Sequence, residues 1–152
     1  MKQINLNLKE NPYTVVIGRN LLSRIGEMVK PVAPGSKIFV VSNKKVAKLF
    51  FEPFSRSLSD AGYQVTLHLL PHGDERDKSE RALLGIWNAM AKLPLERSST
   101  MIALGGGVVG DVAGFAASTY MRGIPVIQVP TTLLAQVDRS EERRVGKECR
   151  SR

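Results

Sequence analysis

Short apolar runs alternate with amphipathic stretches along most of this chain of 152 residues. Runs such as residues 37–41 (KIFVV) are typical of strands buried on both faces of a parallel sheet. Stretches such as residues 46–61 repeat apolar side chains at helical spacing. The pattern predicts strands at residues 37–41, 64–70, 101–104 and 125–129 and helices at residues 21–29, 46–61, 79–90 and 109–117. Strands that alternate with helices favour an open α/β sheet.

The first residues predict a different unit. Ile4, Leu6 and Leu8 alternate with polar residues, as in a half-buried strand. Residues 13–17 are rich in β-branched side chains and predict a second strand, and an Asn-Pro pair between the two segments predicts a turn. We therefore expect an N-terminal β-hairpin before the α/β sheet.

The densest signal is LGGGVVGD at residues 104–111, between a predicted strand and a predicted helix. Glycines let a phosphate approach the backbone closely, and a helix N-terminus can then bind it. The glycines formally satisfy G-x-G-x-x-G, but no acidic residue lies about 20 positions on, as a dinucleotide fingerprint requires. The residues therefore indicate phosphate or dinucleotide binding, and a purely structural turn remains open.

Two further segments place polar side chains where predicted strands end. In residues 71–78 (PHGDERDK), a glutamate could accept ribose hydroxyls and a lysine could meet a phosphate, although charged turns that open a helix are common. Thr131 or Thr132 could begin a last helix and offer hydroxyls to a ligand. Asp138 ends that helix, where the helix dipole disfavours a carboxylate, so both a ligand and an ordinary surface role are open.

Charge and composition narrow the functional class. Of the net charge of +8, residues 139–152 carry +3, and the remaining +5 is spread along residues 1–138 without interleaved aromatic residues. A diffuse charge of this kind favours an enzyme of anionic small molecules over a nucleic-acid binder. No segment has the pattern of a signal peptide or a bilayer span, and the single cysteine, Cys149, fits a reducing compartment. We expect a cytoplasmic protein with no membrane partner. Residues 139–152 are mostly charged, and we expect them to be disordered or foreign to the domain.

Residues 104–138, LGGGVVGDVAGFAASTYMRGIPVIQVPTTLLAQVD, closely resemble the 3-dehydroquinate synthase family. The resemblance begins near residue 1 and implies a Rossmann-like, mostly parallel α/β domain that binds NAD over residues 1–138. It also implies that the family's C-terminal helical domain, which carries zinc or cobalt, is absent from this chain.

The resemblance implies an NAD- and metal-dependent lyase. The family converts 3-deoxy-D-arabino-heptulosonate 7-phosphate to 3-dehydroquinate and phosphate, with transient reduction of NAD. This step belongs to the shikimate route to chorismate and the aromatic amino acids. A full-length member is expected to form a homodimer, and this chain alone is expected to be inactive.

Site residues follow from the resemblance position by position. The implied pyrophosphate loop consists of Gly106, Gly107, Val108, Val109, Gly110 and Asp111. The other implied cofactor-binding residues are Asn43, Asp74, Glu75, Lys78, Thr131 and Thr132. Glu75 and Lys78 match the family's G-E-x-x-K pair for the adenosine ribose, and Asp74 is an extra residue in that turn. Asn43 stands where some members have an aspartate near the ribose.

Two residues are implied to act on the substrate. Asp138 matches the acid that binds substrate near the nicotinamide, and Arg122 matches an arginine close to the substrate phosphate at the dimer interface. After Asp138 the family continues S-S-V-G-G-K, whereas this chain continues RSEERRVGK, so the role of the family lysine is not transferred to Lys147. Truncation, a frameshift or a joined foreign sequence would each produce this break. The family's metal ligands lie in the absent domain, so no metal site is expected here.

Three alternatives remain open at this point. The chain could derive from another sugar-phosphate cyclase or from a metal-dependent polyol dehydrogenase of the same superfamily. It could also be a stand-alone NAD-binding module without catalysis. Release of phosphate without a net change in NADH absorbance would separate a synthase from a dehydrogenase.

Overall fold

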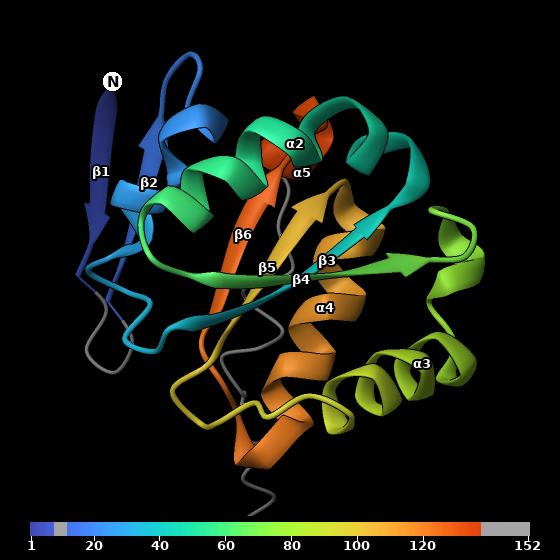
Figure 1. The fold of residues 1–152 in the computed structure, drawn as a ribbon. Coiled ribbons are helices and arrows are strands. Elements are labelled where there is room, and N and C mark those ends of the chain that lie inside the picture. The colour runs from blue at the N-terminus through green and yellow to red at the C-terminus, as the bar shows by residue number, and fades with distance from the viewer. Residues whose placement is uncertain (8–11, 138–152) are drawn as a thin grey trace, which may run out of the picture.

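The computed structural model describes residues 1–7 and 12–137, which form a helix-covered sheet with a hairpin beside it (Figure 1). The hairpin pairs β1 (Lys2–Leu6) with β2 (Tyr13–Ile17) in antiparallel fashion. Within these residues the main sheet is parallel and has the order β4-β3-β5-β6. Its strands are β3 (Lys37–Asn43), β4 (Gln64–Leu70), β5 (Thr100–Gly105) and β6 (Val126–Pro130). The expected Rossmann-like, mostly parallel sheet with an N-terminal hairpin is confirmed.

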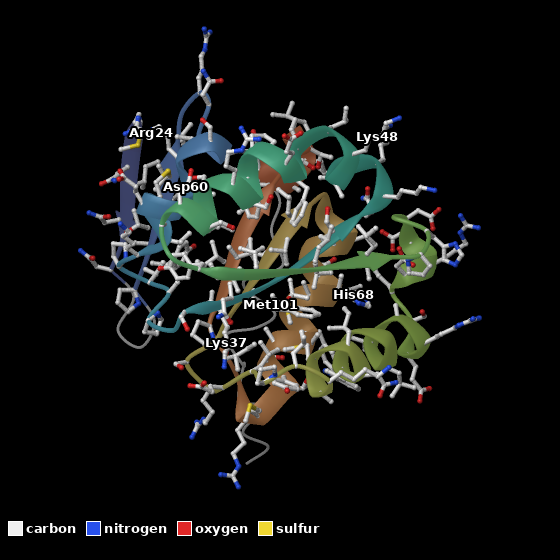
Figure 2. The ribbon with its side chains drawn as sticks, viewed as in Figure 1. Arg24, Lys37, Lys48, Asp60, His68 and Met101 are labelled. Atoms are coloured by element: carbon white, nitrogen blue, oxygen red, sulfur yellow. The ribbon has the colours of Figure 1, made fainter. Side chains whose placement is uncertain are left out.

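Helices cover both faces of the sheet. The helices are α1 (Ile25–Val29), α2 (Lys44–Asp60), α3 (Glu80–Ala91), α4 (Gly107–Thr119) and α5 (Leu133–Val137), with short 3-10 turns at Leu22–Arg24, Glu75–Asp77 and Tyr120–Arg122. Ile38 and Val40 of β3 pack with α1 and α2, whereas Phe39 and Val41 pack with α3 and α4. Side chains alternate between the faces of a strand, so the apolar run that predicted β3 supplies both cores. Figure 2 shows Met101 of β5 within the body of the fold.

Three helix starts differ from the predictions by two residues or more. The helix expected over residues 21–29 is divided into a 3-10 turn and α1. Asn20, which precedes it, has a φ of 56° and accepts a hydrogen bond from the Ser23 hydroxyl through its backbone carbonyl. Helix α4 begins at Gly107 instead of residue 109, and α2 begins at Lys44 behind an Asn43 cap. The two helices that follow β3 and β5 therefore start directly at the strand ends.

Helices α1 and α2 cross at a glycine. A Cβ on Gly26 would lie 2.0 Å from the Ser57 carbonyl oxygen, which is backbone and cannot swing away. We expect Gly26→Ala to lower the free energy of unfolding by about 2 kcal/mol, because overpacking forces the backbone to move. Gly85→Ala is the matched control, since its Cβ would meet only the His68 ring at 4.0 Å. In a helix interior this change should stabilise by up to about 1 kcal/mol. Urea denaturation of both variants measures the two effects, and equal effects would contradict the close crossing.

Candidate functional site

The carboxyl ends of the four parallel strands meet at one edge of the sheet. In the order β4-β3-β5-β6, the chain leaves β3 toward β4 on one side and returns to β5 on the other. Ligands of open α/β sheets bind at such a reversal of strand order, outside the carboxyl ends of the strands. The strand order reverses between β3, which ends at Asn43, and β5, which ends at Gly105. The glycine loop follows β5, and the charged turn at residues 71–78 follows β4, the other neighbour of β3.

The glycine loop leads directly into α4. Gly106 is the N-cap of this helix and provides no side-chain hydrogen bond, and the Gly110 amide donates to the Gly106 carbonyl at 3.1 Å. The first amides of a helix have no partner within it, so the helix start offers N–H donors to a ligand. Val108 and Val109 contribute backbone here, since the Val109 side chain is buried in the core. The start of α4 can therefore bind an anion.

The glycines of this loop have different roles. A Cβ on Gly105 would lie 2.6 Å from Val109 Cγ2, and a Cβ on Gly110 would lie 2.9 Å from Gln128 Oε1. Gly105 is therefore required for close packing against Val109, whereas at Gly110 the flexible end of the Gln128 side chain would have to move. A Cβ on Gly107 would meet nothing within 4 Å, so packing does not explain this glycine. The purely structural interpretation therefore explains Gly105, and the space at Gly107 is open to a ligand.

Thr131 and Thr132 lie beside this loop, as expected. The Thr131 amide donates to the Gly105 carbonyl at 2.9 Å. The Thr131 Oγ1 atom is buried and has no hydrogen-bond partner in the described part of the chain. Thr132 Oγ1 accepts from the Ala135 amide at 3.2 Å and so caps α5, and its side chain lies 3.4 Å from the position of a Cβ on Gly106. Thr131 is thus the threonine whose hydroxyl can still take a ligand.

Lys78 joins the turn after β4 to the glycine-loop helix. Its Nζ lies 3.1 Å from Glu75 Oε1 and 3.1 Å from Asp111 Oδ2 (both ion pairs). The hydrogen bonds to Asp111 and then to Glu75 raise the pKa of Lys78 above its ordinary value. The structure therefore brings together three predicted site residues that come from two separate segments.

Asp74 and Asn43 have local structural partners. Asp74 caps the 3-10 turn at the Arg76 amide, and its two oxygens accept from Arg76 Nε at 2.9 Å and Nη2 at 2.7 Å. The Arg76 guanidinium lowers the pKa of Asp74 to about 2. Asn43 Oδ1 accepts from the Val46 amide at 2.9 Å, and its side chain lies against Gly73. Both side chains border the site, and both are engaged in holding its backbone.

Of the two predicted catalytic residues, the structure describes Arg122 and does not bring it to this edge. Arg122 is exposed and follows the far end of α4, whose 13 residues span about 20 Å. Met121, Arg122 and Gly123 have φ values of 49°, 68° and 104°, so this arginine sits in a tight left-handed turn. Asp138 lies outside the described residues, as do residues 139–152 with Lys147 and Cys149.

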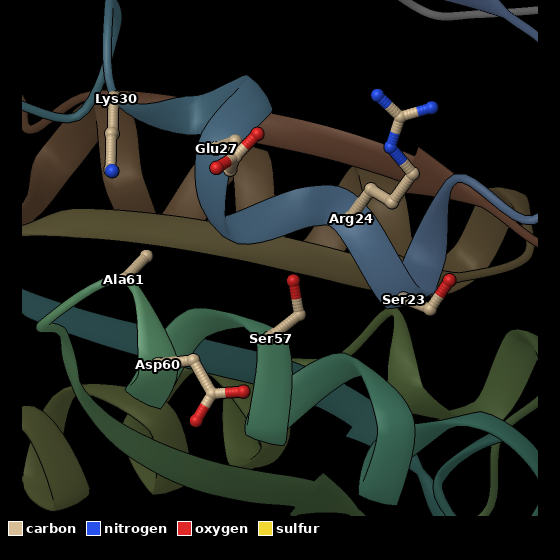
Figure 3. Close-up of a pocket in the computed structure, with 7 residues that line it drawn as sticks. All are labelled: Ser23, Arg24, Glu27, Lys30, Ser57, Asp60 and Ala61. Atoms are coloured by element: carbon tan, nitrogen blue, oxygen red, sulfur yellow. The ribbon is translucent and has the colours of Figure 1, made fainter.

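A small pocket lies elsewhere, between α1 and α2 (Figure 3). Its volume is about 250 Å³, and its lining includes Arg24, Glu27, Lys30 and Asp60. It adjoins the end of α2, whereas the sheet edge that carries the glycine loop adjoins the start of α2. The charged side chains that line this pocket are of both signs and exposed to solvent. Because the pocket lies at the opposite end of α2, it does not extend the candidate site.

The described residues offer neither a metal site nor a membrane-spanning helix. Among residues 1–7 and 12–137, no three His, Cys, Asp or Glu side chains are grouped as metal ligands would be. His68 instead stacks on Phe39 with ring centroids 6.0 Å apart, and burial lowers its pKa. No helix in the described part of the chain has the length and hydropathy needed to cross a membrane.

One residue of the site region was missed. Asp77 lies in the charged turn at residues 71–78, to which the sequence assigns only a possible glutamate and lysine as ligands, yet its side chain is fully buried. Burial of an acid depends on how the turn packs. No sequence signal separates Asp77 from the neighbouring acids Asp74 and Glu75.

Comparisons with known proteins agree with this geometry. A family model described as 3-dehydroquinate synthase N-terminal matches residues 68–148. The 3-dehydroquinate synthase of Prochlorococcus marinus is 47% identical over 146 residues, covering 95% of this chain and 40% of the relative. That of Pelobacter propionicus is 45% identical over 140 residues, covering 92% and 39%. The chain therefore spans about 40% of the length of these curated relatives.

Solved structures show the same fold. A 2-deoxy-scyllo-inosose synthase superposes with a TM-score of 0.79 at 23% identity, covering 88% of this chain and 37% of that one. The 2-epi-5-epi-valiolone synthase of Streptomyces hygroscopicus, solved with NAD+ and Zn2+ bound, has a TM-score of 0.71 at 28% identity and covers 88% and 36%. A glycerol dehydrogenase from Schizosaccharomyces pombe has a TM-score of 0.58 at 23% identity, covering 74% and 26%.

Proposed function

This chain belongs to the 3-dehydroquinate synthase family, and from that premise we propose that residues 1–138 form an NAD-binding domain. The observation that carries the proposal is the open start of α4, with its donor amides and the space at Gly107. The unpaired Thr131 hydroxyl beside it supports the same conclusion. The valiolone synthase relative, which was solved with NAD+, adds support from a similar fold.

The residues around the start of α4 and in the turn after β4 have the donors and acceptors needed to bind the pyrophosphate and the adenosine ribose of NAD. The amides of Gly107 and Val108 at the start of α4 would bind the pyrophosphate, since the helix dipole favours an anion there. The Thr131 hydroxyl would donate to the same ligand. Glu75 and Lys78 would hold the adenosine ribose, and Asn43 would lie near it. The chemistry that bound NAD would supply is the transient, reversible transfer of a hydride from a secondary alcohol.

For the longer protein we propose the reaction of the family. It would convert 3-deoxy-D-arabino-heptulosonate 7-phosphate to 3-dehydroquinate and phosphate, with Asp138 on the substrate beside the nicotinamide. Arg122 and the glycine loop lie at opposite ends of α4, about 20 Å apart. We therefore propose that Arg122 contacts the substrate phosphate bound by a second subunit. The described residues do not fit a metal, and no step through one is assigned to them. We expect this chain alone to release no phosphate.

A second candidate is another sugar-phosphate cyclase. The solved structures similar in fold include enzymes named for two other products. The higher identity to 3-dehydroquinate synthases, 47% against 28%, favours the first candidate. The valiolone synthase was itself solved with NAD+, so the cofactor proposal holds for both candidates.

The proposal is tested by calorimetric titration of the chain with NAD. Lys78→Met should weaken NAD binding about tenfold, because it removes a charged hydrogen-bond donor from the site. Lys92→Met is the matched control, since Lys92 is exposed at the far end of α3. The control should bind like the wild-type chain. Equal affinities for all three proteins would exclude Lys78 from the site.

A further inference from the structure

Asp77 is the one buried charged side chain in the part of the chain that the structure describes. It ends the 3-10 turn Glu75–Asp77, and its relative exposure is 0%. A buried carboxylate is costly unless hydrogen bonds compensate its lost hydration. The function proposed above uses its neighbours Glu75 and Lys78 and leaves Asp77 without a role.

The Asp77 carboxylate holds two consecutive amides. The His72 amide donates to both carboxylate oxygens at 3.3 Å, and the Gly73 amide donates to Oδ2. Hydrogen bonds to an ionised acceptor are stronger than those between neutral groups. The turn from His72 to Asp77 is therefore closed on itself by this one side chain.

The closed turn is also fixed against its surroundings. Gly73 has a φ of 77°, and a Cβ there would lie 2.9 Å from the Asn43 Cβ. Asn43 in turn caps α2. The next residue after Asp77 is Lys78, whose Nζ reaches both Glu75 and Asp111 at 3.1 Å. Moving Asp77 would move the backbone from which Lys78 extends toward α4.

We propose that Asp77 is a positioning residue of the nucleotide site: by closing the turn it sets the reach of Lys78 to Asp111. This inference rests on the proposed function, that the start of α4 binds NAD. It adds a residue that touches no ligand and acts through Lys78. A carboxylate that only stabilised the fold would affect unfolding and leave Lys78 and NAD affinity unchanged.

The first test needs no cofactor. Nuclear magnetic resonance titration of the Lys78 amine in the 152-residue chain should give a pKa above the ordinary lysine value, as its pairing with Asp111 and Glu75 requires. In Asp77→Asn the pKa of Lys78 should fall toward that ordinary value. Asp60→Asn, an exposed acid at the far end of α2, is the matched control and should leave it unchanged. An unaltered Lys78 pKa in folded Asp77→Asn would overturn the proposal.

The second test measures whether the effect of Asp77 on NAD binding depends on Lys78. Asp77→Asn should weaken NAD binding by the folded chain about tenfold, the effect expected from losing one charged hydrogen bond. In a Lys78→Met background the same change should have little further effect, because the path through Lys78 is already removed. Equal losses in both backgrounds would contradict action through Lys78. Absence of NAD binding by the wild-type chain would instead contradict the proposed function itself.

A third measurement uses the wild-type chain and remains decisive if Asp77→Asn does not fold. Saturation with NAD should slow hydrogen exchange of the His72 and Gly73 amides, because a ligand that requires the closed turn disfavours its opening. Unchanged exchange at both amides in NAD-saturated protein would overturn the proposal.

Discussion

Gly107→Asp is expected to weaken NAD binding about a hundredfold or more, since a carboxylate within a few ångström of the pyrophosphate repels it. The same change should leave thermal stability equal or slightly raised. A Cβ at Gly107 meets nothing within 4 Å, and its φ lies outside the left-handed region. An acid in the first turn also interacts favourably with the helix dipole.

Gly107→Asn is the matched control, because it has the same shape without the charge. It should weaken binding less than Gly107→Asp, and both variants should melt near the wild-type temperature. Calorimetry with NAD and thermal unfolding by circular dichroism measure the two effects. Equal NAD affinity for Gly107→Asp and the wild-type chain would exclude the start of α4 as the pyrophosphate site.

Phe54→Ala should lower the free energy of unfolding by about 3–5 kcal/mol, the range for truncating a buried phenylalanine. Phe54 lies on α2, is 0% exposed and packs in the core with Ile38, Val40 and Leu58. This is a large part of the roughly 5–15 kcal/mol that holds a domain folded. Urea denaturation measures the loss.

Phe115→Ala removes the same group from the surface of α4, where it is 52% exposed. Its effect should stay within about 0.5 kcal/mol, as for surface substitutions in general. If both variants lost similar stability, the assignment of the α2 face to the core would be wrong.

The fold was predictable to the extent that it depends on apolar periodicity. Both faces of β3 are buried, so its run of apolar residues indicated a parallel strand directly. Helix α4 begins two residues before its predicted start, because glycine has a low helix propensity and the sequence pattern places Gly107 in the loop. The division of the first helix at Arg24 was not predictable from the sequence. Asparagine is a common helix N-cap, but Asn20 adopts a left-handed backbone conformation here.

The position of the candidate site at the edge of the sheet was predictable from the sequence, whereas most contacts between its side chains were not. Strand ends of a parallel sheet meet at one edge, so Asn43, Lys78, Gly107 and Thr131 could be grouped from the order of elements alone. The ion pair between Lys78 and Asp111 joins positions far apart in the chain and depends on the conformation of the turn. Asp77 shows the same limit, since its burial follows from the closing of that turn. The resemblance supplied ligand roles, and those roles remain proposals.

The position of NAD on the chain is tested most directly by amide resonance mapping during a titration with NAD. The largest shifts are predicted at residues 105–110 and at Thr131 and Thr132, with small changes around the pocket between α1 and α2. Shifts concentrated at residues 24–30 and 57–61, or no shifts in a folded chain at saturating NAD, would contradict an NAD site at the start of α4.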